Sequence, residues 1–265
     1  MQDNFTDSKL RIVILNSTGD SKVKYSADIL YSLFKDPELN IVAVIVKKKA
    51  SSKKSSGLLK TIKKSGSMFF VDASYSVLSK LRGKKTSWDY VPEIVKLDYK
   101  KYFIGPVEYV NKINSSETAE LIKKYKADIC FHSGGVILKE PVLSAAPFGV
   151  LGYHHGDITK YRGGCPAFWE LYNKEKEAGV TLQILSDKLD TGDIVLLERY
   201  RIDKKETIAS LRKKLNEDSV DLAAKALKKL QNKDFKPESN YKKGEYRKDP
   251  GLINFTALKL KRLFA

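Results

Sequence analysis

The chain has 265 residues, 42% of them hydrophobic and 10% aromatic, so it can bury a sizeable core and is too apolar for wholesale disorder. Lys and Arg number 49 against 32 Asp and Glu, and the resulting net charge of +17 favours an anionic partner: nucleic acid, a membrane surface or a phosphorylated substrate. Two cysteines exclude a disulfide scaffold and a cysteine-based zinc module, and no apolar run approaches the roughly 20 residues that span a bilayer.

The first part of the chain predicts a strand, a helix and a second strand. Residues 11–16 are rich in β-formers, and apolar side chains recur at helical spacing over 24–34. Residues 41–46 form a continuous run of mostly β-branched residues, typical of a strand buried on both faces. A strand, a helix and a strand at this spacing predict a βαβ unit and therefore a parallel sheet.

A basic segment interrupts this pattern. Residues 47–64 hold eight lysines and no acidic residue, and serines and Gly57 break the run. We expect a loop-like insertion over about 47–66, followed by a helix near 68–81. A solvated lysine-rich insertion and a phosphate-facing patch both explain this composition.

The alternation of strands and helices then resumes. Further strands are predicted over 107–110, 127–131, 150–153, 180–185 and 194–200, and helices over 116–126 and 206–230. We therefore expect one domain over 1–231 with a Rossmann-like α/β fold: a mostly parallel central sheet with helices on both faces. Residues 232–265 are expected to form a short, basic C-terminal extension.

The three histidines, His132, His154 and His155, all fall where predicted strands end. In open α/β sheets, ligands bind beyond the carboxyl ends of the strands. A second polar loop, residues 186–193, lies between two later strands and carries Asp190. A histidine and an aspartate on separate strand-end loops form the acid–base arrangement that acyl transfer requires.

Other kinds of site are disfavoured by their missing motifs. The chain has no glycine fingerprint for a dinucleotide, no P-loop and no G-x-S-x-G of a serine hydrolase. His154 and His155 would point to opposite faces of an extended strand, which makes them a poor metal pair. The aspartates over 187–193 lack the spacing and final Glu of an EF-hand. We therefore expect no metal site.

Four motifs in order give the chain a resemblance to a known family. They are His154, Tyr161-Arg162-Gly163, Gly179-Val180-Thr181 and Asp190-Thr191-Gly192. Together they resemble the formyltransferase family, whose members act on glycinamide ribonucleotide, methionyl-tRNA and amino sugars. The resemblance runs from about residue 9 to 230 and is densest between 127 and 197.

The resemblance implies transfer of a formyl group from 10-formyltetrahydrofolate to an amine acceptor. His154 would donate to the developing oxyanion and help manage the amine proton, and Asp190 would orient and stabilise its imidazolium. The residues that the resemblance places against folate are Gly135, Val136, Leu138, Val150 and Asp187. Those that it places against the acceptor are Arg162, Gly163, His155 and His132.

Structural roles compete with some of these assignments. Arg162 would serve equally well to brace its loop, and His155 would also fit a structural position. Trp169 and Tyr172, on a helix expected to start near Pro166, are most simply core residues.

The chain departs from the family pattern next to the catalytic histidine. The family's Asn two residues before that histidine is Gly152 here, and the serine two residues after it is Gly156. Loss of one oxyanion donor typically costs about 10²–10³ in rate. We therefore expect either another donor, namely His155, His132 or a backbone N–H freed by the glycine, or a different chemistry.

Three functions follow from these observations. The first is formyl transfer to an amino sugar or another small, phosphorylated amine, in the cytoplasm, because the N-terminus lacks a signal-peptide pattern. The tRNA enzyme is disfavoured because only residues 232–265 remain for its extra β-barrel domain. The second is hydrolysis of the formyl donor. The third is a non-catalytic protein that binds nucleic acid or an anionic membrane surface.

Overall fold

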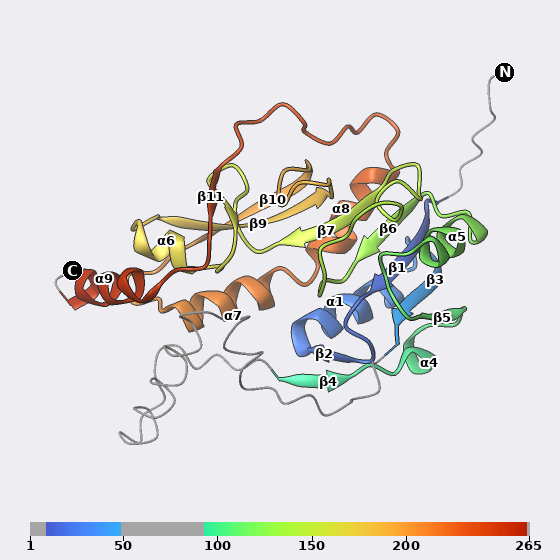
Figure 1. Cartoon of the computed structure of the whole chain (residues 1–265), viewed down its shortest axis with the longest axis horizontal. Helices are drawn as coiled ribbons and strands as arrows, with labels where there is room; N and C mark the ends of the chain where they lie inside the picture. The colour runs from blue at the N-terminus through green and yellow to red at the C-terminus, as the bar shows by residue number, and fades with distance from the viewer. Residues whose placement is uncertain (1–8, 49–92, 264–265) are drawn as a thin grey trace.

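Parallel strands form the centre of the computed structural model, which describes residues 9–48 and 93–263 (Figure 1). They are β1 (Arg11–Asn16), β3 (Asn40–Lys47), β5 (Val107–Val110), β6 (Ile129–His132) and β7 (Val150–His154). Two antiparallel strands, β9 (Glu177–Ile184) and β10 (Asp193–Arg201), extend the sheet beyond β7. The strands lie in the order β10-β9-β7-β6-β1-β3-β5, which confirms the predicted Rossmann-like, mostly parallel sheet.

The direction in which the chain builds the sheet reverses at β1. From β1 the chain adds β3 and then β5 on one side, and afterwards β6 and β7 on the other. The register places Leu15 of β1 beside His132 of β6, and His132 beside Gly152 of β7. Because ligands bind in the crevice at such a reversal, the carboxyl ends of β1, β6 and β7 are where a site is expected.

Alternation along the strands gives the sheet two apolar faces. Ile12 and Ile14 of β1 pack into one core cluster, and Val13 and Leu15 pack into the other. The helices that flank the sheet are α1 (Lys24–Lys35), α5 (Ser116–Lys124), α7 (Ile208–Asp218) and α8 (Leu222–Gln231). α1, α7 and α8 contribute to the first cluster and α5 to the second, so helices cover both faces as expected.

The other predicted elements compare closely with the observed ones. The strands predicted at 11–16, 41–46, 107–110, 127–131, 150–153, 180–185 and 194–200 are confirmed, as are the helices at 24–34 and 116–126. Trp169, expected in the core, is buried on the short helix α6 (Phe168–Tyr172), and Tyr172 packs against the same cluster.

The prediction of one helix over 206–230 is wrong, because the chain breaks there into α7 and α8. Ser219 is fully buried between them. The hydroxyl of Tyr153 on β7 donates a hydrogen bond to the Ser219 carbonyl over 2.6 Å and accepts one from the Ala223 amide over 2.9 Å. This hydroxyl satisfies backbone groups at the end of one helix and the start of the next, so a contact from the sheet stabilises the break.

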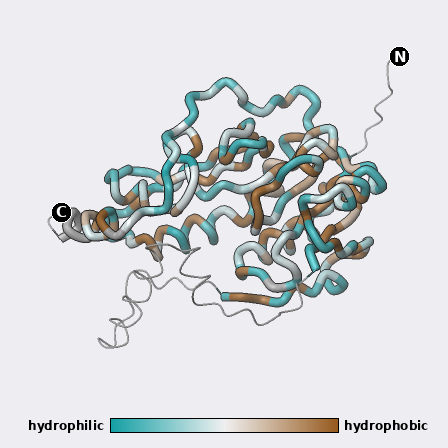
Figure 2. Tube along the Cα trace, in the orientation of Figure 1, coloured by the Kyte–Doolittle hydropathy of each residue, from teal (hydrophilic) through white to brown (hydrophobic). Residues whose placement is uncertain are grey.

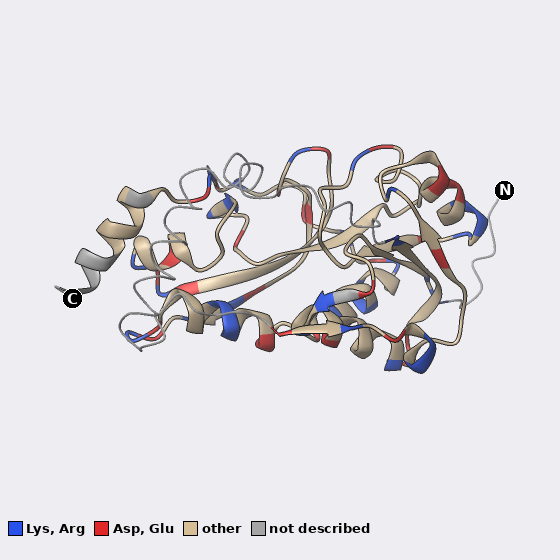
Figure 3. Ribbon diagram, turned by 60° about the horizontal axis from the view of Figure 1, so that its bottom comes forward, with Lys and Arg blue, Asp and Glu red and all other residues tan. Residues whose placement is uncertain are grey.

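A lysine-rich part of the chain lies outside the described residues. It includes the expected insertion from Lys49 onward and the helix expected near 68–81. Residues 49–92 hold ten Lys or Arg against two Asp and therefore carry much of the +17. On the described chain, acidic and basic residues occur together on the outer helices and loops (Figure 3). Two short strands, β2 (Ser21–Val23) and β4 (Ile94–Lys96), pair antiparallel. The short helix α4 (Tyr99–Tyr102) follows β4 in the chain.

The residues expected as a C-terminal extension pack against the rest of the chain. A hydrophilic connection leaves α8 (Figure 2), and β11 (Glu245–Arg247) then pairs in parallel with β8 (Tyr161–Gly163). In α9 (Leu252–Leu263), the ring of Phe255 lies edge-on against Phe168 with centroids 4.8 Å apart. Among the helices of the described ranges, none is long and apolar enough to cross a membrane.

Candidate active site

His154, the last residue of β7, and Asp190, in the turn between β9 and β10, form a largely buried pair. His154 Nδ1 lies 3.3 Å from Asp190 Oδ1, and the side chains are 11% and 12% exposed. Asp190 Oδ2 accepts a hydrogen bond from the Gly163 amide over 2.9 Å, and Gln183 Nε2 lies 3.4 Å from Oδ1. Burial opposes ionisation of Asp190, but His154 and the Gly163 amide together hold its pKa below the usual value. The predicted acid–base pair is therefore in contact.

The backbone around Asp190 explains why an aspartate and a glycine occur in this turn. Asp190 has a φ of +51°, a left-handed conformation that Asp tolerates better than most side chains. A Cβ on Gly192 would lie 1.8 Å from the carbonyl oxygen of Ile184, which leaves no room for a side chain. The side-chain oxygen of Gln183 accepts a hydrogen bond from the Gly192 amide over 2.9 Å. The side chain of Gln183 thus contacts both the backbone of the turn at Gly192 and the carboxylate of Asp190.

Gly156 leaves the space that the imidazole of His154 occupies. A Cβ on Gly156 would lie 2.6 Å from His154 Nε2. The Gly156 carbonyl accepts a hydrogen bond from the hydroxyl of Thr181 over 2.7 Å, which fixes this backbone against β9. A larger residue at position 156 would therefore push the imidazole away from Asp190.

A small hollow beside His154 is lined by Arg162, Cys165 and Glu170. Glu170 is 3% exposed, and its burial raises the pKa of the carboxyl to about 7. Arg162 Nε donates a hydrogen bond to the Gly244 carbonyl over 2.7 Å, so this guanidinium braces the C-terminal segment. Burial raises the pKa of the Cys165 thiol to about 11, which keeps it protonated at neutral pH.

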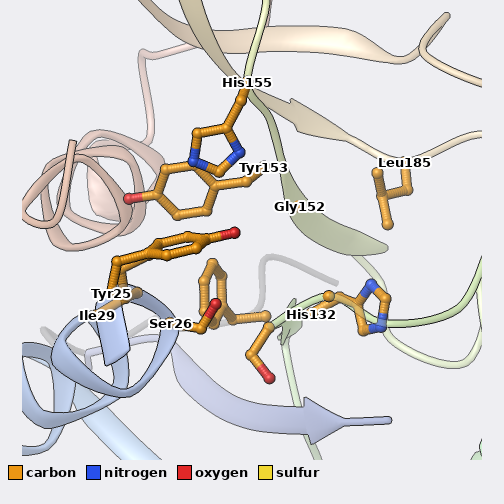
Figure 4. A pocket seen from close by; sticks show the side chains of 11 residues that line it. Tyr25, Ser26, Ile29, His132, Gly152, Tyr153, His155 and Leu185 are labelled. Carbon is orange, nitrogen blue, oxygen red and sulfur yellow. The ribbon is translucent and has the colours of Figure 1, made fainter. Parts of the chain in front are cut away.

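A cavity of about 130 Å³ lies at the reversal of the sheet, next to the start of α1 and the ends of β6 and β7 (Figure 4). The rings of His155, Tyr153 and Tyr25 lie over one another on one side, with Leu185 and His132 on the other. Apolar and aromatic walls with few polar groups are typical of small-molecule sites.

The two histidines that line this cavity are held neutral at pH 7. His132 is 7% exposed, its Nε2 lies 3.2 Å from the Ser17 hydroxyl, and burial together with the charge of Lys22 lowers its pKa to about 3. Burial lowers the pKa of His155 to about 4. Lys22 is 3% exposed and donates to the Ser133 carbonyl over 2.8 Å, and burial lowers its pKa to about 7. The two histidines of the cavity therefore carry no charge at neutral pH, whereas Lys22, outside the lining, is about half protonated.

The five residues expected against folate fall in different environments. Gly135 lies in the turn after β6 with a φ of +113°, and a Cβ there would press against the loop after β1. Leu138 and Val150 are buried in the core cluster on the second face, and Val136 packs against it. Asp187 is exposed in the turn between β9 and β10. Their contact with folate stays a prediction.

Three contributors to the site were not predicted from the sequence. Gln183 lies two residues after Thr181 on β9, so strand alternation could have placed it on the inward face. Glu170 follows Trp169 on a short helix, where a charged residue usually faces solvent. Lys22 is one lysine among many in a basic chain. Its burial depends on packing that the sequence pattern does not contain.

A known protein family matches the part of the chain that contains His154 and Asp190. The family model for formyl transferase matches residues 11–227. The chain belongs to the formyl transferase family. The matched range includes His154 and Asp190 and ends before β11, so the C-terminal strand and helix lie beyond the part that the formyl transferase model describes. Within the described residues, no group of three or more His, Cys, Asp or Glu is placed to hold a metal ion.

Curated members of the family share about a third of their aligned residues with this chain. Methionyl-tRNA formyltransferase of Kosmotoga olearia is 35% identical over 150 residues, which cover 56% of this chain and 47% of that protein. Bifunctional polymyxin resistance protein ArnA of Wigglesworthia glossinidia brevipalpis is 36% identical over 160 residues, 57% of this chain and 24% of that protein. The chain spans about half the length of the first methionyl-tRNA relatives or less.

Solved structures share the fold of this formyl transferase family member at low sequence identity. Glycinamide ribonucleotide transformylase 1 from Symbiobacterium toebii matches with a TM-score of 0.59 and 15% identity, over 91% of this chain and 97% of that chain. HypX from Aquifex aeolicus in complex with tetrahydrofolic acid matches with a TM-score of 0.55 and 16% identity, over 97% of this chain and 34% of that chain.

Proposed function

We propose that the protein transfers a formyl group from 10-formyltetrahydrofolate to an amine acceptor. The observation that carries this proposal is the contact between His154 and Asp190 beside a cavity at the carboxyl edge of the sheet. This pair supplies the acid–base group that acyl transfer needs, within a chain that belongs to the formyl transferase family.

The cavity fits the reacting end of a formyl donor. Its volume of about 130 Å³ is well below the roughly 300–1,000 Å³ that enclose a drug-sized ligand, so it would hold only part of a folate. When bound, 10-formyltetrahydrofolate supplies the electrophilic formyl carbon. Gly135 and Val136, in the turn after β6, are the residues proposed to contact it.

The protein's part in the reaction is orientation and proton management. Asp190 holds the imidazole through Nδ1, so Nε2 is the nitrogen of His154 available for proton transfer. The ionised carboxylate stabilises the imidazolium that forms when Nε2 takes the proton of the attacking amine. His154 then returns this proton to the nitrogen that leaves the formyl group.

The acceptor that we propose is a small amine, either an amino sugar or another small, phosphorylated amine. A nucleic acid or an anionic membrane surface is not favoured as the acceptor-bearing partner. Hydrolysis of the formyl donor is the second candidate, because the adjacent His154 and His155 resemble the paired histidines of some family hydrolases.

Thermal unfolding with a stable donor analogue, 10-formyl-5,8-dideazafolate, tests donor binding. We expect the melting temperature to rise with ligand concentration, because binding stabilises the native state by mass action. No shift at saturating ligand contradicts the proposal and favours a non-catalytic protein. His154→Ala and Asp190→Ala should each remove most formyl transfer while the fold persists. Formate release without any amine indicates hydrolysis, whereas release only with an amino sugar or amino-sugar phosphate indicates transfer.

A further inference from the structure

A buried glutamine on β9 lies beside the pair of His154 and Asp190. The register of β7 and β9 sets Gln183 opposite Gly152, two residues before His154, so Gln183 and His154 share one face of the sheet. Gln183 is 1% exposed. Burial of a side-chain amide costs free energy unless its polar atoms are hydrogen-bonded, so the partners of Gln183 indicate its role.

The orientation of the Gln183 amide group is fixed by a backbone donor. The Gly192 amide donates a hydrogen bond to Gln183 Oε1 over 2.9 Å. If the side-chain amide were rotated by half a turn, its NH₂ group would face this N–H, and two donors cannot bond each other. The NH₂ group therefore lies on the opposite side, where Nε2 donates to Asp190 Oδ1 over 3.4 Å.

Each oxygen of Asp190 accepts a hydrogen bond from an N–H group. Gln183 donates to Oδ1, and the Gly163 amide donates to Oδ2 over 2.9 Å. Donors on both oxygens favour the ionised carboxylate, which can only accept. His154 Nδ1 lies 3.3 Å from Oδ1, so this nitrogen carries the hydrogen when the ring is neutral. The other ring nitrogen, Nε2, then holds a lone pair.

We propose that Gln183 is a positioning residue that selects the tautomer of His154. Its NH₂ group keeps Asp190 Oδ1 an acceptor, the hydrogen of the neutral imidazole stays on Nδ1, and Nε2 stays free to take a proton from the attacking amine. This inference rests on the proposed function, in which Nε2 is the base. Gln183 acts through Asp190, and its own orientation comes from the Gly192 amide, so the backbone of the β9–β10 turn sets the tautomer.

Two substitutions at position 183 separate support of the turn from donation to Asp190. Gln183→Met is similar in length and removes both hydrogen bonds. Gln183→Glu keeps an oxygen for the Gly192 amide, but its second oxygen faces Asp190 Oδ1. Two carboxylates this close share a proton. Asp190 can then donate to Nδ1 of His154, which places the hydrogen of the neutral ring on Nε2.

A glutamine outside the site provides the matched control. Gln231, the last residue of α8, donates from Nε2 to the Glu38 carbonyl over 3.3 Å. Gln231→Met therefore makes the same chemical change as Gln183→Met and also removes a hydrogen bond. All variants are made in the full chain, and circular dichroism with urea unfolding checks that each is folded.

Nitrogen NMR of the full chain labelled with ¹⁵N-histidine reads the tautomer directly. The signals of the neutral His154 ring are identified by their loss in His154→Ala. We expect the hydrogen on Nδ1 in the wild-type protein and in Gln231→Met, a mixture of tautomers in Gln183→Met, and the hydrogen on Nε2 in Gln183→Glu. A residue that only supports the turn would not move these signals.

Turnover is the second measurement. Consumption of 10-formyltetrahydrofolate in the presence of an amino sugar should fall about 10–100-fold in both Gln183 variants, the loss typical when an outer hydrogen-bond partner of a functional side chain is removed. Affinity for 10-formyl-5,8-dideazafolate should stay unchanged, because Gln183 acts on the state of the base. Gln231→Met should match the wild-type protein in both measurements.

The tautomer of the wild-type protein decides the proposal first. If the neutral His154 ring carries its hydrogen on Nε2, Gln183 does not select the tautomer and the proposal is wrong. If Gln183→Glu keeps the wild-type tautomer and turnover, Gln183 only supports the turn through Gly192, which also overturns it. If the variants change the tautomer as expected but the wild-type protein neither binds the analogue nor turns over the donor, the proposed function fails and the role of Gln183 stands.

Discussion

Replacement of Glu170 by glutamine should make the protein more stable at alkaline pH, and the gain should vanish as the pH falls. Glu170 is 3% exposed on α6, and burial raises the pKa of its carboxyl from 4.5 to about 7. Amides at the start of its own helix and His154 favour the ionised form, but these effects are weaker than the desolvation. Glutamine keeps the shape and polar atoms of the side chain and cannot ionise.

The direction in which the free energy of unfolding changes with pH follows from proton binding by Glu170. Between pH 4.5 and 7 the native state holds a proton on Glu170 that the unfolded chain has lost, so the free energy of unfolding decreases as the pH rises. At 1.36 kcal/mol per pKa unit, the cost of this carboxyl grows from about 1 kcal/mol near pH 5 to about 3 kcal/mol at pH 8. Glu170→Gln should remove this pH-dependent cost.

Urea unfolding followed by circular dichroism at pH 5, 6, 7 and 8 measures the difference between the two proteins. Glu177→Gln, at the exposed first position of β9, controls for the loss of one negative charge at the surface. A stability difference between wild type and Glu170→Gln that stays constant over this pH range, or that grows toward acid, would show that the carboxyl is not buried in its neutral form.

Two further substitutions test other parts of the molecule. Gly156→Ala should displace the imidazole of His154, because its Nε2 would lie 2.6 Å from the new Cβ. Formyl turnover should therefore fall by at least tenfold, with little change in urea unfolding. Unchanged turnover would contradict this geometry. Phe255→Ala should reduce the free energy of unfolding by about 3–5 kcal/mol, because this ring is 6% exposed in the core cluster. Ile253→Ala, at an 84% exposed position of the same helix, should leave urea unfolding nearly unchanged, and equal effects of the two would refute docking of α9.

The periodicity of apolar residues was enough to predict the sheet, and the order of the motifs was enough to predict that His154 and Asp190 lie together at its edge. The β-branched run of β3 and the helical spacing of α1 depend only on neighbouring residues, so the pattern predicts both. His154 and Asp190 could be paired because strand ends meet at one edge of a sheet. The break between α7 and α8 could not be predicted, because the hydroxyl of Tyr153 that stabilises it comes from a distant strand.

The environment of the site depends on packing rather than on sequence pattern. Nothing in the residues around Gly152 indicates that Leu185 fills the space beside it. In the same way, the burial of Glu170 and of the Nε2 atom of His155 arises from neighbours brought together by the fold. The sequence predicted that His154 and Asp190 lie together at the edge of the sheet, and the structure places them in contact. The protonation state of the groups around them required the structure.

The pairing of β8 with β11 also sets an order of events during synthesis. Arg162 and the Gly244 carbonyl that it binds are 82 residues apart, so this wall of the site closes only after Gly244 has been translated. At about 5–20 residues per second, the ribosome takes roughly 4–16 s to cover that distance. His154, Gly163 and Asp190 all precede Gly244, so His154 and Asp190 can meet on the nascent chain before the wall is in place. The site therefore matures later than the sheet that carries it.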